Sequence, residues 1–121
     1  MELKGKARID FEKWFINTYY KKSRKPIQNL QRLVFDSLPN NQKYGVYVDW
    51  FDSVGVVVTI EFMDNSRITG YEYAIHTQND RDYNGEDCMD MAKIIYSDYI
   101  KNRPEARTKA IEKAVEIYNN K

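Results

Sequence analysis

The sequence predicts a small α+β protein, a single domain over residues 1–121 in which a short antiparallel β-hairpin or sheet is covered by several helices. Three observations lead to this prediction. A length of 121 residues corresponds to one domain. Both ends of the chain carry apolar residues at helical spacing. Its middle holds a β-branched run followed by a second strand-like segment.

The N-terminal part predicts two helices. The first covers roughly residues 6–22, and its apolar face consists of Phe11, Trp14, Phe15, Thr18 and Tyr19. The cationic stretch KKSRKP is expected to end this helix, since Pro26 disfavours helix at Lys25. A second, shorter helix has Pro26 at its first position and ends before Pro39. Its apolar residues are Ile27, Leu30, Leu33, Val34 and Leu38.

The segment NNQKYGVYVDWFDSVG, residues 40–55, fits two patterns. Its residues 44–50 alternate as a strand would, and the same stretch also matches a helix face. The ends favour a helix, because Asn40 or Asn41 can act as the N-cap and Gly55 stands where a left-handed residue is needed. A helix is therefore the prediction, with a strand over 44–50 left open.

The second half predicts a hairpin and two more helices. VVVTIEFM, residues 56–63, is typical of a buried strand, and residues 67–76 return as its antiparallel partner. A helix is expected next, from the spacing of Cys88, Met91, Ala92, Ile95 and Tyr99. The last helix has Pro104 in its first turn, followed by Glu105. Its apolar stripe is Ile111, Ala114, Val115 and Tyr118.

Composition indicates the compartment and the distribution of charge. Cys88 is the single cysteine, and no apolar run is long enough for a membrane span or a signal peptide, so we expect a cytoplasmic protein. The net charge is +1 but uneven: residues 1–25 carry 8 basic and 3 acidic residues, 26–100 carry 5 and 12, and 101–121 carry 6 and 3. Such a chain can recognise a partner by charge, or pair its ends with its centre.

The stretch NDRDYNGED, residues 79–87, opens like an EF-hand calcium loop, with the order D-x-D-x-N-G from Asp80 to Gly85. The later ligand positions fall on Cys88 and Met91, which are poor ligands for a hard cation. A strand is also expected before the loop, where an EF-hand has a helix. The alternative is a polar turn in which Glu86 or Asp87 caps the next element. We predict no metal and no cofactor, although cation binding by the loop stays open.

No catalytic motif stands out in the sequence. The Gly-x-Ser-x-Gly, phosphate-binding glycine-loop and His-Glu-x-x-His patterns are absent. His76 is the single histidine and is expected at the surface. Asp49 and Asp52 would share a helix face, and paired carboxylates can do acid–base chemistry, but separate surface charges are the commoner case. We therefore predict a protein that is not an enzyme.

Basic residues interleaved with aromatic ones mark a candidate nucleic-acid surface at the N-terminus. Cations hold the phosphate backbone, and rings between them can stack on bases. The candidates are Lys4, Lys6, Arg8, Lys13, Lys21, Lys22, Arg24 and Lys25. Trp14 lies on the apolar stripe of the first helix and is expected in the core. A nucleic-acid-binding protein that uses this helix and the C-terminal helix is the alternative function.

Two stretches, FDSLPNNQKYGVYVDWFDSVG (35–55) and RPEARTKAIEKAVEIYN (103–119), resemble segments of small accessory proteins of phages and prophages. The resemblance covers under half of the chain and carries no active-site residue. It implies an accessory gene of a mobile element, and hence the cytoplasm of a host cell. Small proteins of that setting are often non-enzymatic inhibitors of host defence, such as anti-CRISPR proteins.

The leading functional hypothesis is therefore a non-enzymatic protein that occupies a surface of a host macromolecule. A CRISPR effector or another defence nuclease is the expected partner. Carboxylates in the acidic middle of the chain would mimic nucleic acid in the partner's basic groove. The candidate contact residues are Asp80, Asp82, Glu86, Asp87 and Asp90. The identity of the partner and the oligomeric state stay open.

Overall fold

The computed structural model describes residues 1–65, 67–77 and 93–120. These residues form four helices and a three-stranded antiparallel sheet. The strand order is β1-β2-β3, with both β1 and β3 at an edge. The predicted α+β class is confirmed. The elements are α1 (Gly5–Tyr19), α2 (Lys25–Asp36), α3 (Asn40–Ser53), β1 (Val56–Asp64), β2 (Thr69–Thr77), β3 (Lys93–Tyr96) and α4 (Arg103–Asn119).

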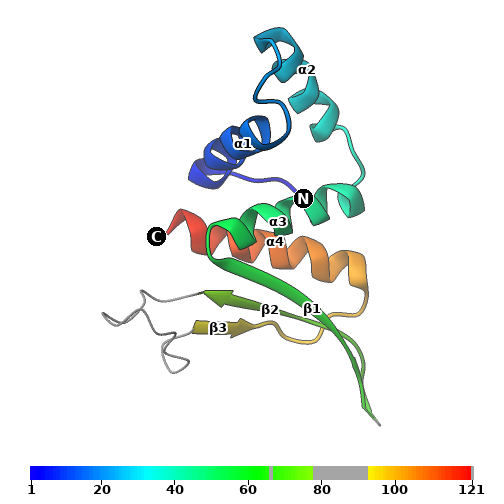
Figure 1. Ribbon diagram of the computed structural model, residues 1–121. Helices are drawn as coiled ribbons and strands as arrows, with labels where there is room; N and C mark the ends of the chain where they lie inside the picture. The colour runs from blue at the N-terminus through cyan, green and yellow to red at the C-terminus, as the bar shows by residue number, and fades with distance from the viewer. Residues whose placement is uncertain (66, 78–92, 121) are drawn as a thin grey trace, which may run out of the picture.

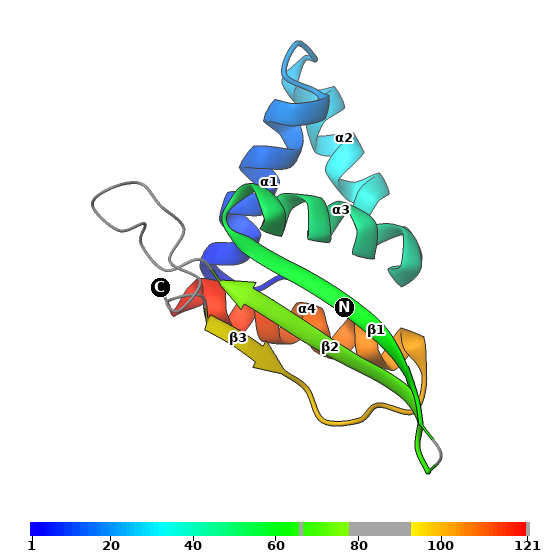
Figure 2. The ribbon, with the colours of Figure 1, turned by 60° about the horizontal axis from the view of Figure 1, so that its bottom comes forward.

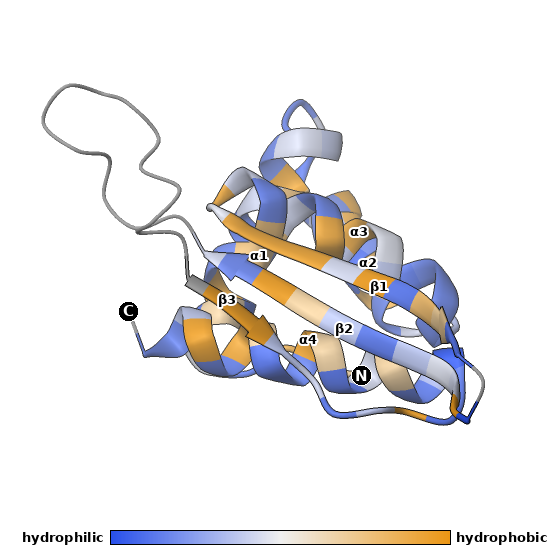
Figure 3. Ribbon diagram, turned by 90° about the horizontal axis from the view of Figure 1, so that it is seen from below, coloured by the Kyte–Doolittle hydropathy of each residue, from blue (hydrophilic) through white to orange (hydrophobic). Residues whose placement is uncertain are grey.

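The elements are arranged in three tiers (Figure 1). Helices α3 and α4 cover one face of the sheet, and α1 and α2 form a helical hairpin on the side of α3 and α4 that faces away from the sheet. Between sheet and helices lie the most deeply buried side chains, which are Trp50, Phe51, Val56, Ile75 and Ile111. The strands are mostly apolar where all three lie side by side (Figure 3). Toward the β1–β2 turn β2 becomes polar, whereas β1 alternates apolar and polar residues up to the turn.

An aromatic cluster joins the helical hairpin to the middle tier. The ring of Phe11 in α1 lies 5.4 Å from Phe35 of α2, 5.0 Å from Tyr47 and 5.7 Å from Trp50 of α3, measured between centroids. Aromatic pairs at such separations contribute beyond their burial. The hairpin is therefore fixed to the body mainly through Phe11, and α2 follows through Phe35.

The helix predicted for residues 40–55 is confirmed as α3. Its buried side chains Tyr47, Trp50 and Phe51 recur at helical spacing and contact the tiers on both sides. Gly55 has φ 82° and continues the chain into β1 from the left-handed region, as predicted. The predicted N-cap is wrong: Asn40 and Asn41 lie inside the first turn, and Pro39 takes the N-cap position without a side-chain hydrogen bond.

Helix α1 ends at Tyr19, earlier than the predicted residue 22. Tyr20 leaves the helical conformation with φ −134°, and its ring lies 5.6 Å from that of Phe15. The carbonyl oxygen of Tyr20 accepts hydrogen bonds from Ser23 N at 3.0 Å and from Gln28 Nε2 at 3.1 Å. Of the cationic stretch that was expected to end the helix, residues 21–24 lie in the α1–α2 turn. Lys25 and Pro26 begin α2, so the expectation that Pro26 excludes helix at Lys25 is wrong.

A side chain of α4 caps the start of α1. Lys4 occupies the N-cap position of α1 and makes no side-chain capping bond. Instead, the Asn119 side chain accepts a hydrogen bond from Ala7 N at 2.8 Å and donates one to the carbonyl oxygen of Lys4 at 2.9 Å. Unpaired N–H groups at a helix start need such acceptors. Asn119 thus binds the first helix to the last.

The helix predicted after the acidic loop is wrong in the described residues. Residues 93–96 form β3, in which Ile95 lies opposite Ile75. Isoleucine is β-branched and suits a strand, and the edge of β2 supplies the backbone partners with which β3 pairs. Downstream, Tyr71 and Ile100 exchange two backbone hydrogen bonds of 2.8 Å. The residues from Cys88 to Ala92 lie outside the described part.

The two strands predicted at residues 56–63 and 67–76 are present as β1 and β2, but burial of β1 is confirmed for its first half only. Val56 and Val58 are buried, while Phe62 is 54% exposed and contacts Tyr71 at a ring distance of 5.4 Å. The end of the hairpin extends beyond the helices (Figure 2).

Helix α4 matches its prediction, since all four residues of its expected stripe are buried. The side chain of Asn102, at the N-cap, accepts a hydrogen bond from Glu105 N at 2.9 Å. Among the described helices, none combines the length and apolar character needed to cross a bilayer.

Candidate functional site

The acidic residues proposed as a contact surface, Asp80, Asp82, Glu86, Asp87 and Asp90, lie outside the described residues. The same holds for the rest of the calcium-like stretch. Both hypotheses therefore stay predictions. Within the described ranges, no group of three or more His, Cys, Asp or Glu side chains is placed to hold a metal ion.

The other titratable candidates, His76 and the pair Asp49 and Asp52, lie on different elements. His76 is half-buried on β2, opposite Val57 and Ile94, on the sheet face away from the helices. Asp49 and Asp52 are both exposed on α3. Partial desolvation, and then the negative charge of Asp49, raise the pKa of Asp52. This carboxylate pair shares a helix face, as predicted.

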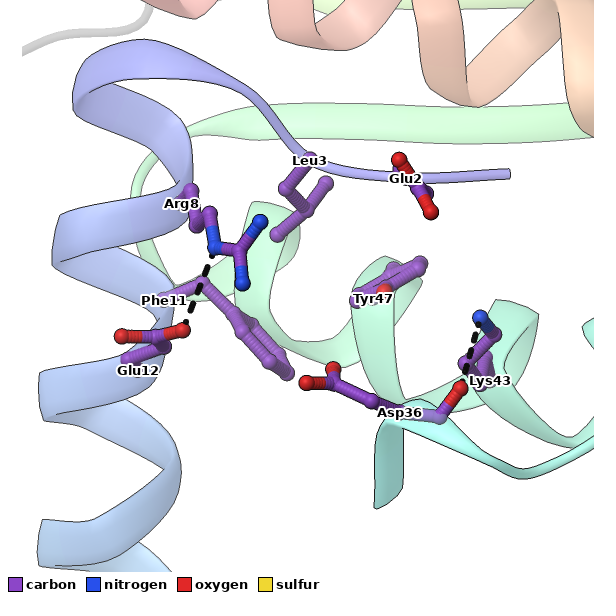
Figure 4. A pocket seen from close by; sticks show the side chains of 8 residues that line it. All are labelled: Glu2, Leu3, Arg8, Phe11, Glu12, Asp36, Lys43 and Tyr47. Atoms are coloured by element: carbon purple, nitrogen blue, oxygen red, sulfur yellow. Dashed lines mark hydrogen bonds and ion pairs between the residues drawn. The ribbon is translucent and has the colours of Figure 1, made fainter. Parts of the chain in front are cut away.

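A small pocket of about 120 Å³ lies among the N-terminal segment, α1, α3 and the end of α2 (Figure 4). Lys43 is buried there and donates to the carbonyl oxygen of Asp36 at 3.4 Å. Burial, and then the carboxylates of Asp36 and Glu2, raise the pKa of Tyr47 to about 12. Its hydroxyl is therefore protonated at neutral pH. These polar groups join the end of α2 to α3.

Residues 13–35 form the segment with the most charges of one sign that no opposite charge interrupts. We call this segment the basic lobe. It carries six Lys or Arg residues and no Asp or Glu. It comprises the second half of α1, the α1–α2 turn and nearly all of α2, and it stands at the end of the molecule opposite the sheet (Figure 1). Its cations are Lys13, Lys21, Lys22, Arg24, Lys25 and Arg32.

A groove of about 470 Å³ runs between α1 and α2. Ile9 and Ile16 of α1 supply its apolar surface. Its cations are Lys13, Lys21, Lys25 and Arg32. The groove also contains Glu12, but its carboxylate oxygens lie 3.3 Å from Arg8 Nε and 3.4 Å from Arg32 Nη1.

The three groove lysines carry uncompensated charge. The described part of the chain forms four ion pairs, and none of them involves Lys13, Lys21 or Lys25. All three side chains are exposed. Like charges gathered around a concave surface raise the local concentration of anions. The groove is therefore suited to an anionic ligand.

The eight basic residues predicted to contact nucleic acid fall into two groups in the structure. Lys13, Lys21 and Lys25 line the groove, and Lys22 and Arg24 lie in the adjoining turn. The other three lie at the base of α1: Lys4 and Lys6 are exposed, with Lys6 Nζ 5.2 Å from the Tyr118 ring centre, and Arg8 pairs with Glu12. Sequence reasoning missed Arg32, which the absence of acidic residues from 13 to 35 would have indicated.

The cations of α4 already contact neighbouring groups. Lys109 lies 3.1 Å from Glu105, and Lys113 lies 3.3 Å from Glu116. The guanidinium of Arg107 lies 5.4 Å from the Tyr44 ring centre, and that of Arg103 lies 5.2 Å from the ring of Tyr71. A contribution of this helix to anion binding is therefore less favoured than one from the basic lobe.

Among the aromatic residues of the lobe, Trp14 is half-buried and packs on the core, as predicted. Its ring lies 5.9 Å from Phe11 and 5.8 Å from Tyr19. Tyr19 is exposed, whereas the Tyr20 hydroxyl donates to Gln31 Oε1 at 3.3 Å. Tyr19 is thus the most exposed ring of this set, although it also contacts the ring of Phe15 at 5.4 Å.

The class that the fold defines is a small α+β protein with a basic helical hairpin. No family model, no curated protein and no solved structure matches the chain. The resemblance to phage and prophage accessory proteins stays a prediction.

Proposed function

We propose that this chain is a non-enzymatic binding protein whose basic lobe binds the phosphate backbone of nucleic acid. The observation that supports the proposal is the acid-free segment 13–35, in which three groove lysines have no carboxylate partner within the described chain. Phosphates are dense fixed negative charges, and neutralising them releases counterions, which drives association.

The dimensions of the groove suit a short stretch of backbone. Ile9 and Ile16 are seven residues apart on α1, which corresponds to roughly 10 Å along the helix axis. A nucleic-acid strand of that length presents about three phosphates. The three groove lysines without an ion-pair partner in the described chain, Lys13, Lys21 and Lys25, match this number. Backbone contacts carry no sequence information, so we expect binding with little sequence preference.

The test is fluorescence anisotropy of a labelled single-stranded oligonucleotide at several salt concentrations. The parent should bind with an affinity that falls steeply with salt. A variant with Lys13, Lys21 and Lys25 changed to Gln should bind more weakly, with a salt slope smaller by about 2, because each phosphate contact on a single strand contributes about 0.7.

The matched control changes three exposed cations outside the lobe, Lys4, Arg67 and Lys101, to Gln. It alters the net charge equally and should keep the parent slope. Equal losses in the two triple variants would mean that net charge rather than the groove is responsible. Salt-independent binding, or none in the parent, would reject the nucleic-acid proposal.

The resemblance of residues 35–55 and 103–119 to phage accessory proteins favours a second candidate. In it, the chain occupies a surface of a host protein such as a defence nuclease, through Asp80, Asp82, Glu86, Asp87 and Asp90. Neutralising these residues should slow association with a protein captured from host lysate, because electrostatic steering acts mainly on the on-rate. An unchanged rate would leave this candidate without its contact surface.

A further inference from the structure

The two helices that border the groove turn unlike faces toward each other. On α1 the groove residues Ile9, Lys13 and Ile16 are spaced at i, i+4 and i+7 and share one face of the helix. All the groove residues of α2 are polar, and they are Lys25, Gln28, Asn29 and Arg32. The apolar stripe of α2 lies outside the groove and is exposed, and it consists of Ile27, Leu30, Leu33 and Val34. Helix α2 therefore adds no apolar side chain to the groove, and Ile9 is 56% exposed.

Three amide side chains also line the groove, and part of their hydrogen-bonding capacity is unused. Gln28 Nε2 donates to the carbonyl oxygen of Tyr20 at 3.1 Å, which leaves Gln28 Oε1 as an acceptor. Asn29 Oδ1 accepts a hydrogen bond from Arg32 Nη2, which leaves Asn29 Nδ2 as a donor. The side chain of Asn17 is exposed and forms no hydrogen bond with the described part of the chain. The groove thus presents donors and acceptors beside an accessible apolar surface.

An unpaired nucleobase has surfaces of both kinds. Proteins that hold a single base outside a duplex contact its faces with aromatic or apolar side chains and its edge with hydrogen bonds. In a duplex the faces are stacked and the edges are paired, so neither is available to such a groove. The groove volume of about 470 Å³ lies within the roughly 300–1,000 Å³ of small-ligand sites. A phosphate backbone alone would make no use of the apolar surface.

We propose that the groove receives an unpaired base while the groove lysines contact the neighbouring phosphates, so that the ligand is single-stranded nucleic acid rather than duplex. This inference rests on the proposed binding of nucleic acid and adds the class of nucleic acid that is bound. The base lies against Ile9 and Ile16 of α1, and its edge faces Gln28 and Asn29 of α2. Asn17 offers both a donor and an acceptor, so the groove can hold any of the bases, in keeping with little sequence preference.

Fluorescence anisotropy with three labelled probes of equal phosphate number tests the proposal. The probes are a thymidine single strand, a strand of the same length made of abasic sites, and a blunt duplex. The parent should bind the thymidine strand roughly fivefold more tightly than either of the others. Electrostatic attraction alone would favour the duplex, whose charge density is higher, so this order of affinities reports contact with the base.

Ile9→Ser removes apolar surface from the groove without a change of charge. It should weaken binding of the thymidine strand roughly fivefold. The salt slope, the duplex affinity and the melting temperature should stay at the parent values, because the side chain is exposed and contacts no phosphate. Asn17→Ala should have a smaller effect of the same kind. The matched control is Ile68→Ser, at an isoleucine that is 47% exposed beside the start of β2, and it should bind as the parent does.

Two results would overturn the inference. One is equal or tighter binding of the abasic strand or the duplex by the parent, and the other is an Ile9→Ser variant that binds the thymidine strand as the parent does. In both cases, a steep salt dependence that the triple lysine variant reduces would still support binding of the phosphate backbone. A parent that binds none of the probes would reject the proposed function together with this inference.

Discussion

Replacing Asn119 by Ala removes the cap that α4 provides for α1. The substitution deletes the acceptor of Ala7 N at 2.8 Å and the donor to Lys4 O at 2.9 Å. Ala7 is fully buried, so its N–H is left without a partner, at a cost of about 1–3 kcal/mol. Lys4 is exposed and water replaces its lost donor, which adds little. We expect a loss of about 2 kcal/mol, which corresponds to a fall in melting temperature of roughly 5–10 °C.

Urea unfolding monitored by tryptophan fluorescence measures this loss. Asn119→Asp keeps an acceptor at the positive end of α1 and loses the donor, so it should cost less than Asn119→Ala. Asn120→Ala is the matched control, since Asn120 is exposed and its side chain makes none of these bonds. A neutral Asn119→Ala variant, or an Asp variant as unstable as the Ala variant, would refute the capping argument.

Four further outcomes are expected. Ile111→Asp places an unpaired carboxylate at a fully buried position and should abolish cooperative unfolding by circular dichroism; an unchanged melting temperature would contradict the tier arrangement. Gly55→Val at φ 82° should cost about 1–3 kcal/mol in urea titrations, and Gly55→Asn less. Gly70→Ala should destabilise strongly in urea titrations, because the new Cβ would overlap the Tyr99 ring and lie 2.6 Å from the backbone oxygen of Ile100. The pKa of Tyr47 is raised from 10 to about 12 in the folded state, so the folded state favours the neutral hydroxyl. The free energy of unfolding that this preference contributes is fully present below pH 10 and is lost as the pH rises toward 12. In Tyr47→Phe, urea titrations should show a smaller fall in stability over this pH range.

Local patterns were sufficient to predict α4 and α3. Asn102 and Pro104 mark the start of α4 in the sequence, and burial of Ile111 follows from its spacing. In α3 the left-handed Gly55 decided between helix and strand, and the structure agrees.

The errors concern residues whose outcome depends on distant partners. The stripe of α2 has the pattern of a buried helix, but Phe35 lies off that stripe and directs the helix the other way. Ile95 is spaced from Tyr99 as in a helix, but in the structure it lies in β3 and pairs with Ile75 at the edge of β2. In the candidate site, the acid-free segment 13–35 includes Arg32 among its cations, but the position of Arg32 at the groove depends on the packing of α2 beside α1.

The contact between Asn119 and Ala7 also constrains the order of folding during synthesis. The two residues are separated by 112 positions, and a ribosome needs on the order of 10 s to add that many. Throughout this interval the first turn of α1 has no acceptor for its buried N–H group. The aromatic contacts of Phe11 can form once α3 has emerged, but the start of α1 is secured only after residue 119 has been made. The first turn of the helix that is synthesised first is thus the part of it that is fixed last.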